Sequence, residues 1–180
     1  MTDENRASED GVTLTETPDS GTPPPAQGKI SFAIERIYVR DLSLEVPMGA
    51  KTFNRPRQPN VVQNIATAVN KLDDARYEVL LKLTISAKDG DDDVYLVEVE
   101  QAGVFIIRGA EEKSLMKMVN VHCPTVLFPY AREVIDNMLS RGNFPPLMLP
   151  AINFEGLFQN ALAEKQAAKE QAPEQSPQAE

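Results

Sequence analysis

The side chains best suited to covalent chemistry are the only histidine and the only cysteine, which are neighbours at His122 and Cys123. A cysteine nucleophile needs a base that takes its proton and a third group that orients the base. Adjacent residues rarely aim their side chains at one another, and no motif supplies the third group. We therefore interpret both residues as structural, and a single cysteine excludes an intramolecular disulfide.

The acidic turn near residue 90 resembles a calcium-binding loop only in part. Acidic side chains occupy positions 1, 3, 5 and 12 of an EF-hand pattern, at Asp89, Asp91, Asp93 and Glu100. Position 6 of that motif is glycine, but here it is Val94, and residues 94–99 alternate like a strand. We interpret the segment as a solvated turn.

Other chemical motifs are missing from the sequence. One histidine and one cysteine cannot build a metal cluster, and no glycine-rich phosphate loop or Gly-x-Ser-x-Gly motif occurs. We expect no catalytic residue, no metal and no cofactor, so the protein should not be an enzyme. An enzyme that uses scattered carboxylates stays open as an alternative, with no residue pair to favour it.

Asp41 and Glu45 are a further carboxylate pair, because they share one face of an alternating segment. Four residues of strand place them about 13 Å apart. Paired acid and base carboxylates of glycosidases lie roughly 5–9.5 Å apart, so this pair is too wide for that chemistry. Two interpretations remain, a solvated strand face and a docking surface for a basic partner.

Composition limits the class of protein further. The chain has 180 residues, 42% of them hydrophobic, and a formal net charge of −9. That length fits one domain, and the negative charge disfavours binding to nucleic acid or to anionic lipid. No apolar run approaches the roughly 20 residues of a membrane-spanning helix, and the start of the chain lacks the pattern of a secretory signal. We expect a cytoplasmic protein.

Apolar alternation predicts four strands. Residues 30–46 alternate with two slips, after Ile34 and after Val39, and each slip requires a bulge or a bend. Residues 77–87 and 94–107 form a predicted hairpin, in which Gln101 and Gly103 interrupt the apolar face and indicate a bulge or a close approach. Residues 61–72 are ambiguous between strand and helix, and we predict a strand.

Helical spacing follows the strands. We expect a helix over 110–122 that ends at Pro124, and a second over about 128–141 with Pro129 in its first turn and Gly142 as its stop signal. A last helix begins after a predicted N-cap at Asn153 and fades after about residue 165.

These elements predict an α+β fold, a four-stranded antiparallel sheet with helices packed on one face. We expect a disordered, acidic and proline-bearing arm over 1–29, one domain over 30–165 and a disordered tail over 166–180.

Several short sequence motifs, in order along residues 31–163, resemble those of the SecB family of bacterial protein-export chaperones. They are Ile37-Tyr38, Asp41, Glu45, Tyr77-Glu78-Val79, Glu98-Val99, Cys123-Pro124, Leu127-Phe128-Pro129-Tyr130-Ala131-Arg132-Glu133, Ser140-Arg141-Gly142, Phe144-Pro145 and Asn153-Phe154. The resemblance implies a SecB-like fold, assembled as a homotetramer that is a dimer of dimers. It also implies an ATP-independent chaperone that binds unfolded preproteins and delivers them to the motor SecA for export.

The resemblance assigns roles to three groups of residues. It implies SecA binding by Asp41, Glu45, Leu96 and Glu98, and the alternation already places Asp41 with Glu45, and Leu96 with Glu98. A client-binding groove would use Tyr38, Val61, Ile65, Tyr95 and Phe158. The oligomer interface would use Val97, Val99, Gln101, Tyr130, Val134 and Met138.

Two features depart from the family pattern. The family's Gln-Gly-Gly is Gln101-Ala102-Gly103 here, and the arm before Lys29 has no counterpart in short family members. A SecB-like holdase dedicated to one partner, such as a toxin of a toxin–antitoxin system, is the alternative function. In that case the charges of Asp41 and Glu45 should be dispensable.

Overall fold

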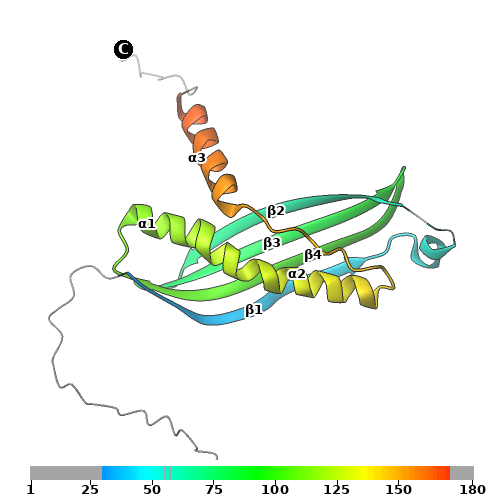
Figure 1. Cartoon of the computed structure of the whole chain (residues 1–180), viewed down its shortest axis with the longest axis horizontal. Helices are drawn as coiled ribbons and strands as arrows, with labels where there is room; N and C mark the ends of the chain where they lie inside the picture. Colours follow the sequence, from blue (N-terminus) through cyan, green and yellow to red (C-terminus); the bar gives the residue numbers. More distant parts are fainter. Residues whose placement is uncertain (1–29, 55, 57, 171–180) are drawn as a thin grey trace, which may run out of the picture.

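A single antiparallel sheet forms the body of the protein in the computed structural model, which describes residues 30–54, 56 and 58–170. The sheet has four strands in the order β1-β4-β3-β2 (Figure 1). The strands are β1 Ser31–Glu45, β2 Asn60–Lys71, β3 Arg76–Asp89 and β4 Asp92–Arg108. The ambiguous segment is therefore a strand, as predicted, and β1 and β2 are the edges.

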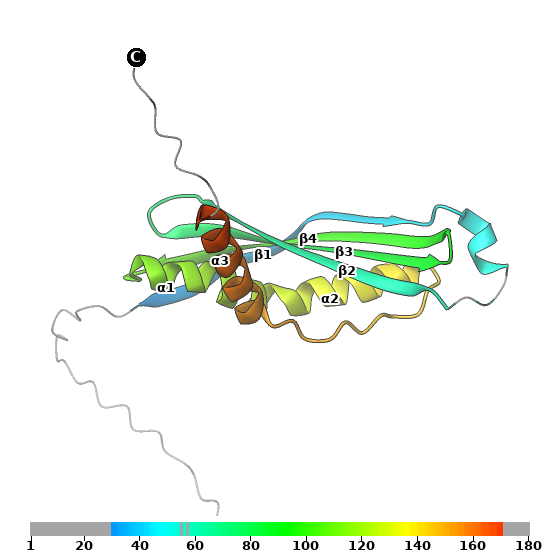
Figure 2. The same cartoon turned by 90° about the horizontal axis from the view of Figure 1, so that it is seen from above.

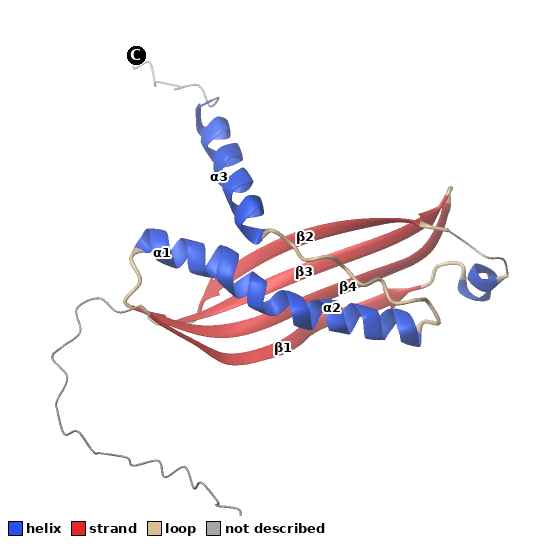
Figure 3. Cartoon of the chain, viewed as in Figure 1, coloured by secondary structure: helices blue, strands red, loops and turns tan. Residues whose placement is uncertain are grey.

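Helical segments follow the sheet in the chain. They are α1 Glu112–Lys117, the π turn η2 Met118–His122, α2 Cys123–Arg141 and α3 Phe154–Glu170, with a short 3-10 turn η1 Gly49–Phe53 between β1 and β2. Figure 2 shows α2 on one side of the sheet, and Figure 3 shows it running along the strands. The predicted fold class is confirmed.

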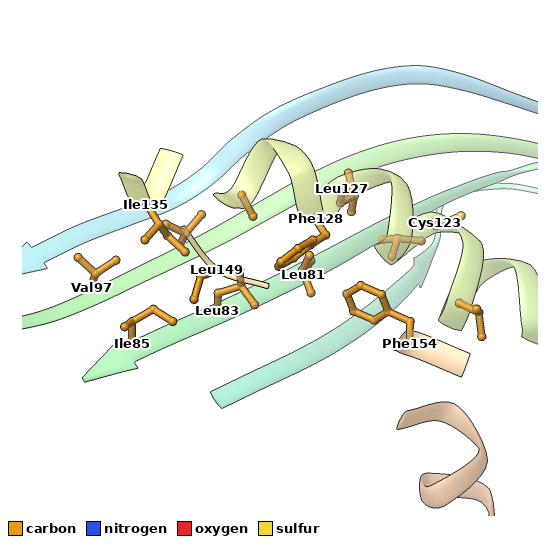
Figure 4. Packing of buried hydrophobic residues seen from close by; sticks show 14 of the residues in the cluster. Leu81, Leu83, Ile85, Val97, Cys123, Leu127, Phe128, Ile135, Leu149 and Phe154 are labelled. Atoms are coloured by element: carbon orange, nitrogen blue, oxygen red, sulfur yellow. The ribbon is translucent and has the colours of Figure 1, made fainter. Parts of the chain in front are cut away.

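The core lies between α2 and the two central strands. Alternate residues of β3 and β4, such as Leu81, Leu83 and Val97, have no exposed surface. Leu127 and Ile135 of α2 are equally buried and pack on them (Figure 4). One face of a helix presents residues three or four apart, and one face of a strand presents alternate residues. The apolar residues at these two spacings pack against each other to form the core.

Two bulges keep the apolar side chains of β1 on the helix side of the sheet. Its pairing with β4 shifts register between Ile34 and Arg36 and again between Val39 and Asp41. Each shift restores the alternation to the same face, because one extra residue reverses the direction of every side chain that follows. Both predicted slips are confirmed.

The predicted end of the first helix at Pro124 is wrong. The chain passes from α1 through η2 into α2 without a break, and the N–H of Cys123 donates to the carbonyl of Met118, five residues back. The wider π turn accommodates Pro124 within the continuous helical segment, since a π turn relaxes the ladder that proline interrupts. Pro129 consequently lies inside α2 and not in its first turn.

α3 begins at the predicted cap. Asn153 Oδ1 accepts a hydrogen bond of 3.0 Å from the N–H of Gly156, so the side chain satisfies one of the free donors of the first turn. The helix continues to Glu170, past the expected end at about 165, and points away from the sheet (Figure 1). None of the described helices is both long and apolar enough to span a membrane.

Gly103 marks a close approach between β4 and α2, as its sequence context predicted. A Cβ atom at this position would lie 2.7 Å from the ring of Phe105 and 2.8 Å from Cδ2 of Leu127. The pairing of β4 with β3 shows no register shift here, so the bulges belong to β1. The missing side chain lets the helix pack directly on the strand.

We expect Gly103→Ala to lower the free energy of unfolding by about 1–3 kcal/mol, because the added methyl group overpacks a filled core. Urea unfolding followed by circular dichroism measures the change. Ala66→Ser, which adds one atom to an exposed position of β2, is the control and should change stability by less than about 0.5 kcal/mol. An unchanged midpoint for Gly103→Ala would contradict the close approach.

Candidate binding surfaces on the two sides of the sheet

A cleft of about 580 Å³ lies on the helix side of the sheet, where η1, β2, β4 and the loop after α2 meet. Aromatic, proline and aliphatic side chains supply most of its wall. The lining residues are Thr52, Phe53, Asn54, Pro56, Pro59, Val61, Val94, Tyr95, Asn143, Phe144, Pro145, Pro146 and Leu147. We call this the aromatic cleft, and it contains the predicted client-binding residues Val61 and Tyr95.

Three aromatic rings form the centre of the aromatic cleft. The ring centroid of Phe144 lies 4.8 Å from that of Tyr95 and 5.4 Å from that of Phe53. Tyr95 is 6% exposed, and this burial raises the pKa of its phenol, whereas Phe53 is 48% exposed. An apolar side chain that enters gains roughly 1.5–3 kcal/mol from burial, and ring contacts favour aromatic residues.

The end of α2 positions Phe144. The N–H of Phe144 donates to the carbonyl of Leu139 at 2.9 Å, and that of Asn143 donates to Ser140 at 3.1 Å, which is a Schellman ending. Asn143 has the left-handed backbone, with φ of 62°, whereas Gly142 has φ of −76°. Gly142 is needed for space instead, because its Cβ would lie 2.7 Å from Cδ2 of Leu44.

A second hollow, of about 250 Å³, lies farther along the helix side. It contains the predicted client-binding residues Ile65 and Phe158, together with Thr67, Asn120, Phe154, Leu157 and Ala161. Val61 and Ile65 point to the same face of β2, which places the two hollows on one side of the sheet. Their separation along the strand is about 13 Å, so one extended segment can reach both.

Tyr38 lies apart from the other predicted client-binding residues. It pairs with Ala102 on the opposite face of the sheet, which we call the open face. Its hydroxyl donates to Glu78 Oε1, and Asn70 donates to Glu78 Oε2 at 2.9 Å. The hydrogen bond to Glu78 raises the pKa of Tyr38 and lowers that of Glu78. Tyr38 thus belongs to a polar network and not to either hollow.

The open face brings the four predicted SecA-binding residues together. Glu45 pairs directly with Leu96, and Glu98 pairs with Ser43. Asp41 pairs with Glu100, a carboxylate that the sequence prediction did not include.

Glu98 is held in its charged form on the open face. It accepts a hydrogen bond of 2.8 Å from the Thr84 hydroxyl and one of 3.3 Å from Lys82, which lower its pKa. Its pKa is lower than that of an ordinary glutamate, so Glu98 is a carboxylate at neutral pH and forms an ion pair with Lys82.

The predicted interface residues fall into two groups. Val97, Val99 and Gln101 are buried on the helix side of β4, within a single chain. Tyr130 is 50% exposed on α2, and the half-buried Val134 and Met138 lie on the same helix. The first group therefore forms part of the protomer's own core, whereas the second lies on α2 with Tyr130 exposed and Val134 packed at the margin of the core.

Gln101 combines burial with an incomplete set of hydrogen bonds. Its Nε2 donates to the carbonyl of Tyr38 at 2.8 Å, whereas its Oε1 has no hydrogen-bond donor among the described residues. A buried acceptor without a donor costs about 1–3 kcal/mol.

The neighbouring residues His122 and Cys123 differ in their exposure to solvent. Cys123 has no exposed surface, and burial raises the pKa of its thiol to about 12, while His122 is exposed. A thiol with this pKa is not a nucleophile at neutral pH. Among the described residues, no group of three or more His, Cys, Asp and Glu side chains converges on a metal site.

Sequence reasoning missed Phe53, Phe144 and Leu147 as members of the aromatic cleft. A signal for Phe144 was present, since it follows the helix stop and precedes two prolines. Phe53 lies in a proline-rich loop with no periodicity, and only the folded sheet brings it to Phe144.

The chain is similar to proteins of one known family. The family model described as preprotein translocase subunit SecB matches residues 25–165. The protein-export protein SecB of Cellvibrio japonicus is 46% identical over 149 residues, which cover 82% of this chain and 89% of that protein. The protein-export protein SecB of Marinobacter nauticus is 45% identical over 152 residues, which cover 83% of this chain and 92% of that protein.

A solved structure shares the fold. It is a SecB-like chaperone of Mycobacterium tuberculosis in complex with a peptide from the HigA1 antitoxin, with a TM-score of 0.55 and 20% identity. The match covers 67% of this chain and 90% of that one. The match of the family model and the identity to the two relatives establish that this chain belongs to the SecB family of protein-export proteins.

Proposed function

We propose that the protein is an ATP-independent chaperone that holds unfolded preproteins on the helix side of its sheet and presents its open face to SecA. The observation that carries the proposal is the division of the surface into apolar hollows on one side and carboxylates on the other. Membership of the SecB family supports export as the purpose of binding.

Client binding needs apolar area and little sequence specificity. The aromatic cleft and the second hollow each accept apolar side chains, and an extended chain can occupy both. Several weak contacts along one client add up to useful avidity, because the second contact forms at high effective concentration. No covalent step and no cofactor is required for holding.

SecA docking would use the charge of the open face. Asp41, Glu45 and Glu98 lie on neighbouring strands, and Leu96 adds a half-buried apolar contact among them. Such a surface steers a basic partner and sets the rate of association more than the final affinity. The complex should weaken as salt concentration rises.

We infer a homotetramer, built as a dimer of dimers, from the family together with unpartnered apolar surface. Ile30, Phe32, Ile34 and Val39 of the first edge of the sheet are 39–48% exposed, and Tyr130 of α2 is 50% exposed. A mass near four times 19.9 kDa in solution would support the tetramer, and a monomer would contradict it.

The place of action that fits this proposal is the cytoplasm, where preproteins are found before export. The partners are unfolded preproteins, SecA and further copies of the chain, without nucleic acid and without insertion into a membrane. A holdase dedicated to one toxin is not favoured. The relatives at 38–46% identity carry the name of export proteins, and the structure with an antitoxin peptide is only 20% identical.

Light scattering of an unfolded preprotein tests the proposal. The preprotein is diluted from denaturant with and without a stoichiometric amount of assembled protein. We expect aggregation to be suppressed without ATP. Aggregation that proceeds unchanged would contradict the proposed function.

A further inference from the structure

The loop after α2 is tied back to the helix by one carboxylate. Asp136 Oδ1 accepts hydrogen bonds from the N–H groups of Leu147, at 2.9 Å, and of Met148, at 3.2 Å. Asp136 lies one helical turn before Leu139, whose carbonyl accepts from the N–H of Phe144. One turn of α2 therefore holds both ends of the segment 144–147.

The segment 144–147 is a wall of the aromatic cleft. All four of its residues line the cleft, and the two in the middle are Pro145 and Pro146. Proline fixes φ near −65°, so the middle of the segment has little freedom once its ends are held. Asp136 and the helix end together fix the wall in one conformation.

Met148 shows that the attachment works against a local preference. Its φ is 52°, a left-handed conformation that is uncommon for residues with a Cβ atom, and its side chain is 74% exposed. Burial therefore does not hold this conformation in the protomer. The bond to Asp136 does, assisted by the buried neighbour Leu149, whose carbonyl accepts from Arg132 at 3.4 Å.

We propose that Asp136 is a positioning residue for client binding, which keeps the wall of the aromatic cleft in its binding-competent shape. The inference rests on the proposed holding function. A wall that is ordered in advance spares the client the cost of ordering it, and this raises affinity without any contact between Asp136 and the client. Only the aromatic cleft should depend on Asp136, because the second hollow contains no residue of the wall.

Two substitutions separate the acceptor from the charge. Asp136→Ala removes the acceptor and should weaken binding of a labelled unfolded preprotein segment by about tenfold, as expected for the loss of two hydrogen bonds. Asp136→Asn keeps a side-chain carbonyl at the same place and should retain binding within about twofold. Fluorescence anisotropy measures the dissociation constant, and circular dichroism and solution mass confirm that each variant is folded and assembled.

A double-mutant cycle locates the effect. Asp136→Ala should cause no further loss in a Phe144→Ala background, where the aromatic cleft is already disabled, and its full loss in a Phe158→Ala background. Equal losses in both backgrounds, or an Asn variant as weak as the Ala variant, would overturn the positioning role. Failure of the unsubstituted protein to bind the segment at all would instead overturn the proposed function.

Discussion

Phe144→Ala is expected to weaken the binding of an unfolded preprotein by about 100-fold. The ring of Phe144 contacts those of both Tyr95 and Phe53, so its removal takes away the centre of the aromatic cleft and leaves both neighbours without this ring contact. Truncation of a central aromatic residue at an interface costs 2 kcal/mol or more, and about 2.7 kcal/mol corresponds to 100-fold in affinity.

Two controls accompany this measurement. Phe144→Leu keeps apolar volume without the ring and should lose less affinity than the alanine variant. Leu72→Ala truncates a 49% exposed side chain in the loop between β2 and β3, outside both hollows, and should leave client affinity within about threefold. Titration of a labelled preprotein gives the dissociation constants, and an unchanged value for folded Phe144→Ala would show that clients bind elsewhere.

The second large effect is expected on the open face. Replacement of Asp41, Glu45 and Glu98 by Asn, Gln and Gln removes three neighbouring charges and should weaken SecA association by about 100-fold at low salt, at roughly 1 kcal/mol for each charge. The remaining association should depend less on salt. Client binding should stay unchanged, because the hollows lie on the other side of the sheet.

A charge-matched variant serves as the control for the open face. The control removes three charges from exposed positions outside the open face, one in the turn between β3 and β4 and two at the start of α1. The substitutions are Asp91→Asn, Glu111→Gln and Glu112→Gln. This variant has the same net charge as the first, so any general effect of charge on SecA association appears in both. Surface plasmon resonance at several salt concentrations compares the two, and equal losses would contradict docking on the open face.

Local patterns predicted most of the sheet. Alternation identified β3 and β4, and the two interruptions of alternation located both bulges of β1 within a residue or two. The prediction was possible because the sheet buries one face against α2, so the apolar residues of each strand show which of its side chains point to the core. The same parity placed Asp41 with Glu45, and Leu96 with Glu98, on one face of their strands, and the structure shows that the two pairs share the open face.

The helices were harder to predict because proline and glycine have more than one compatible geometry. A proline at the position of Pro124 usually ends a helix, but here a π turn precedes it and the helical segment continues. The packing of Leu127 and Ile135 against the sheet supports the continuous segment. Gly142 was expected as the stop signal of the helix, yet the left-handed residue at its end is Asn143, and Gly142 is instead required for space beside Leu44.

Only part of the candidate binding surface could be predicted from the sequence. Val61 and Tyr95 were assigned to the client groove, whereas Phe53 and Phe144 became visible only when distant segments met. Tyr38 was assigned with them, but the bulges of β1 place it on the open face beside Glu78. Contacts between residues far apart in the chain leave no local pattern, so periodicity cannot reveal them.

The central claim is that unfolded client and SecA use opposite sides of one sheet. A sedimentation measurement tests it most directly, with the assembled protein saturated by a labelled unfolded preprotein and then mixed with SecA that carries a second label. We predict that both labels sediment together in a complex larger than either binary complex. Displacement of the preprotein label by SecA in the absence of ATP, with no complex that carries both labels, would contradict the claim.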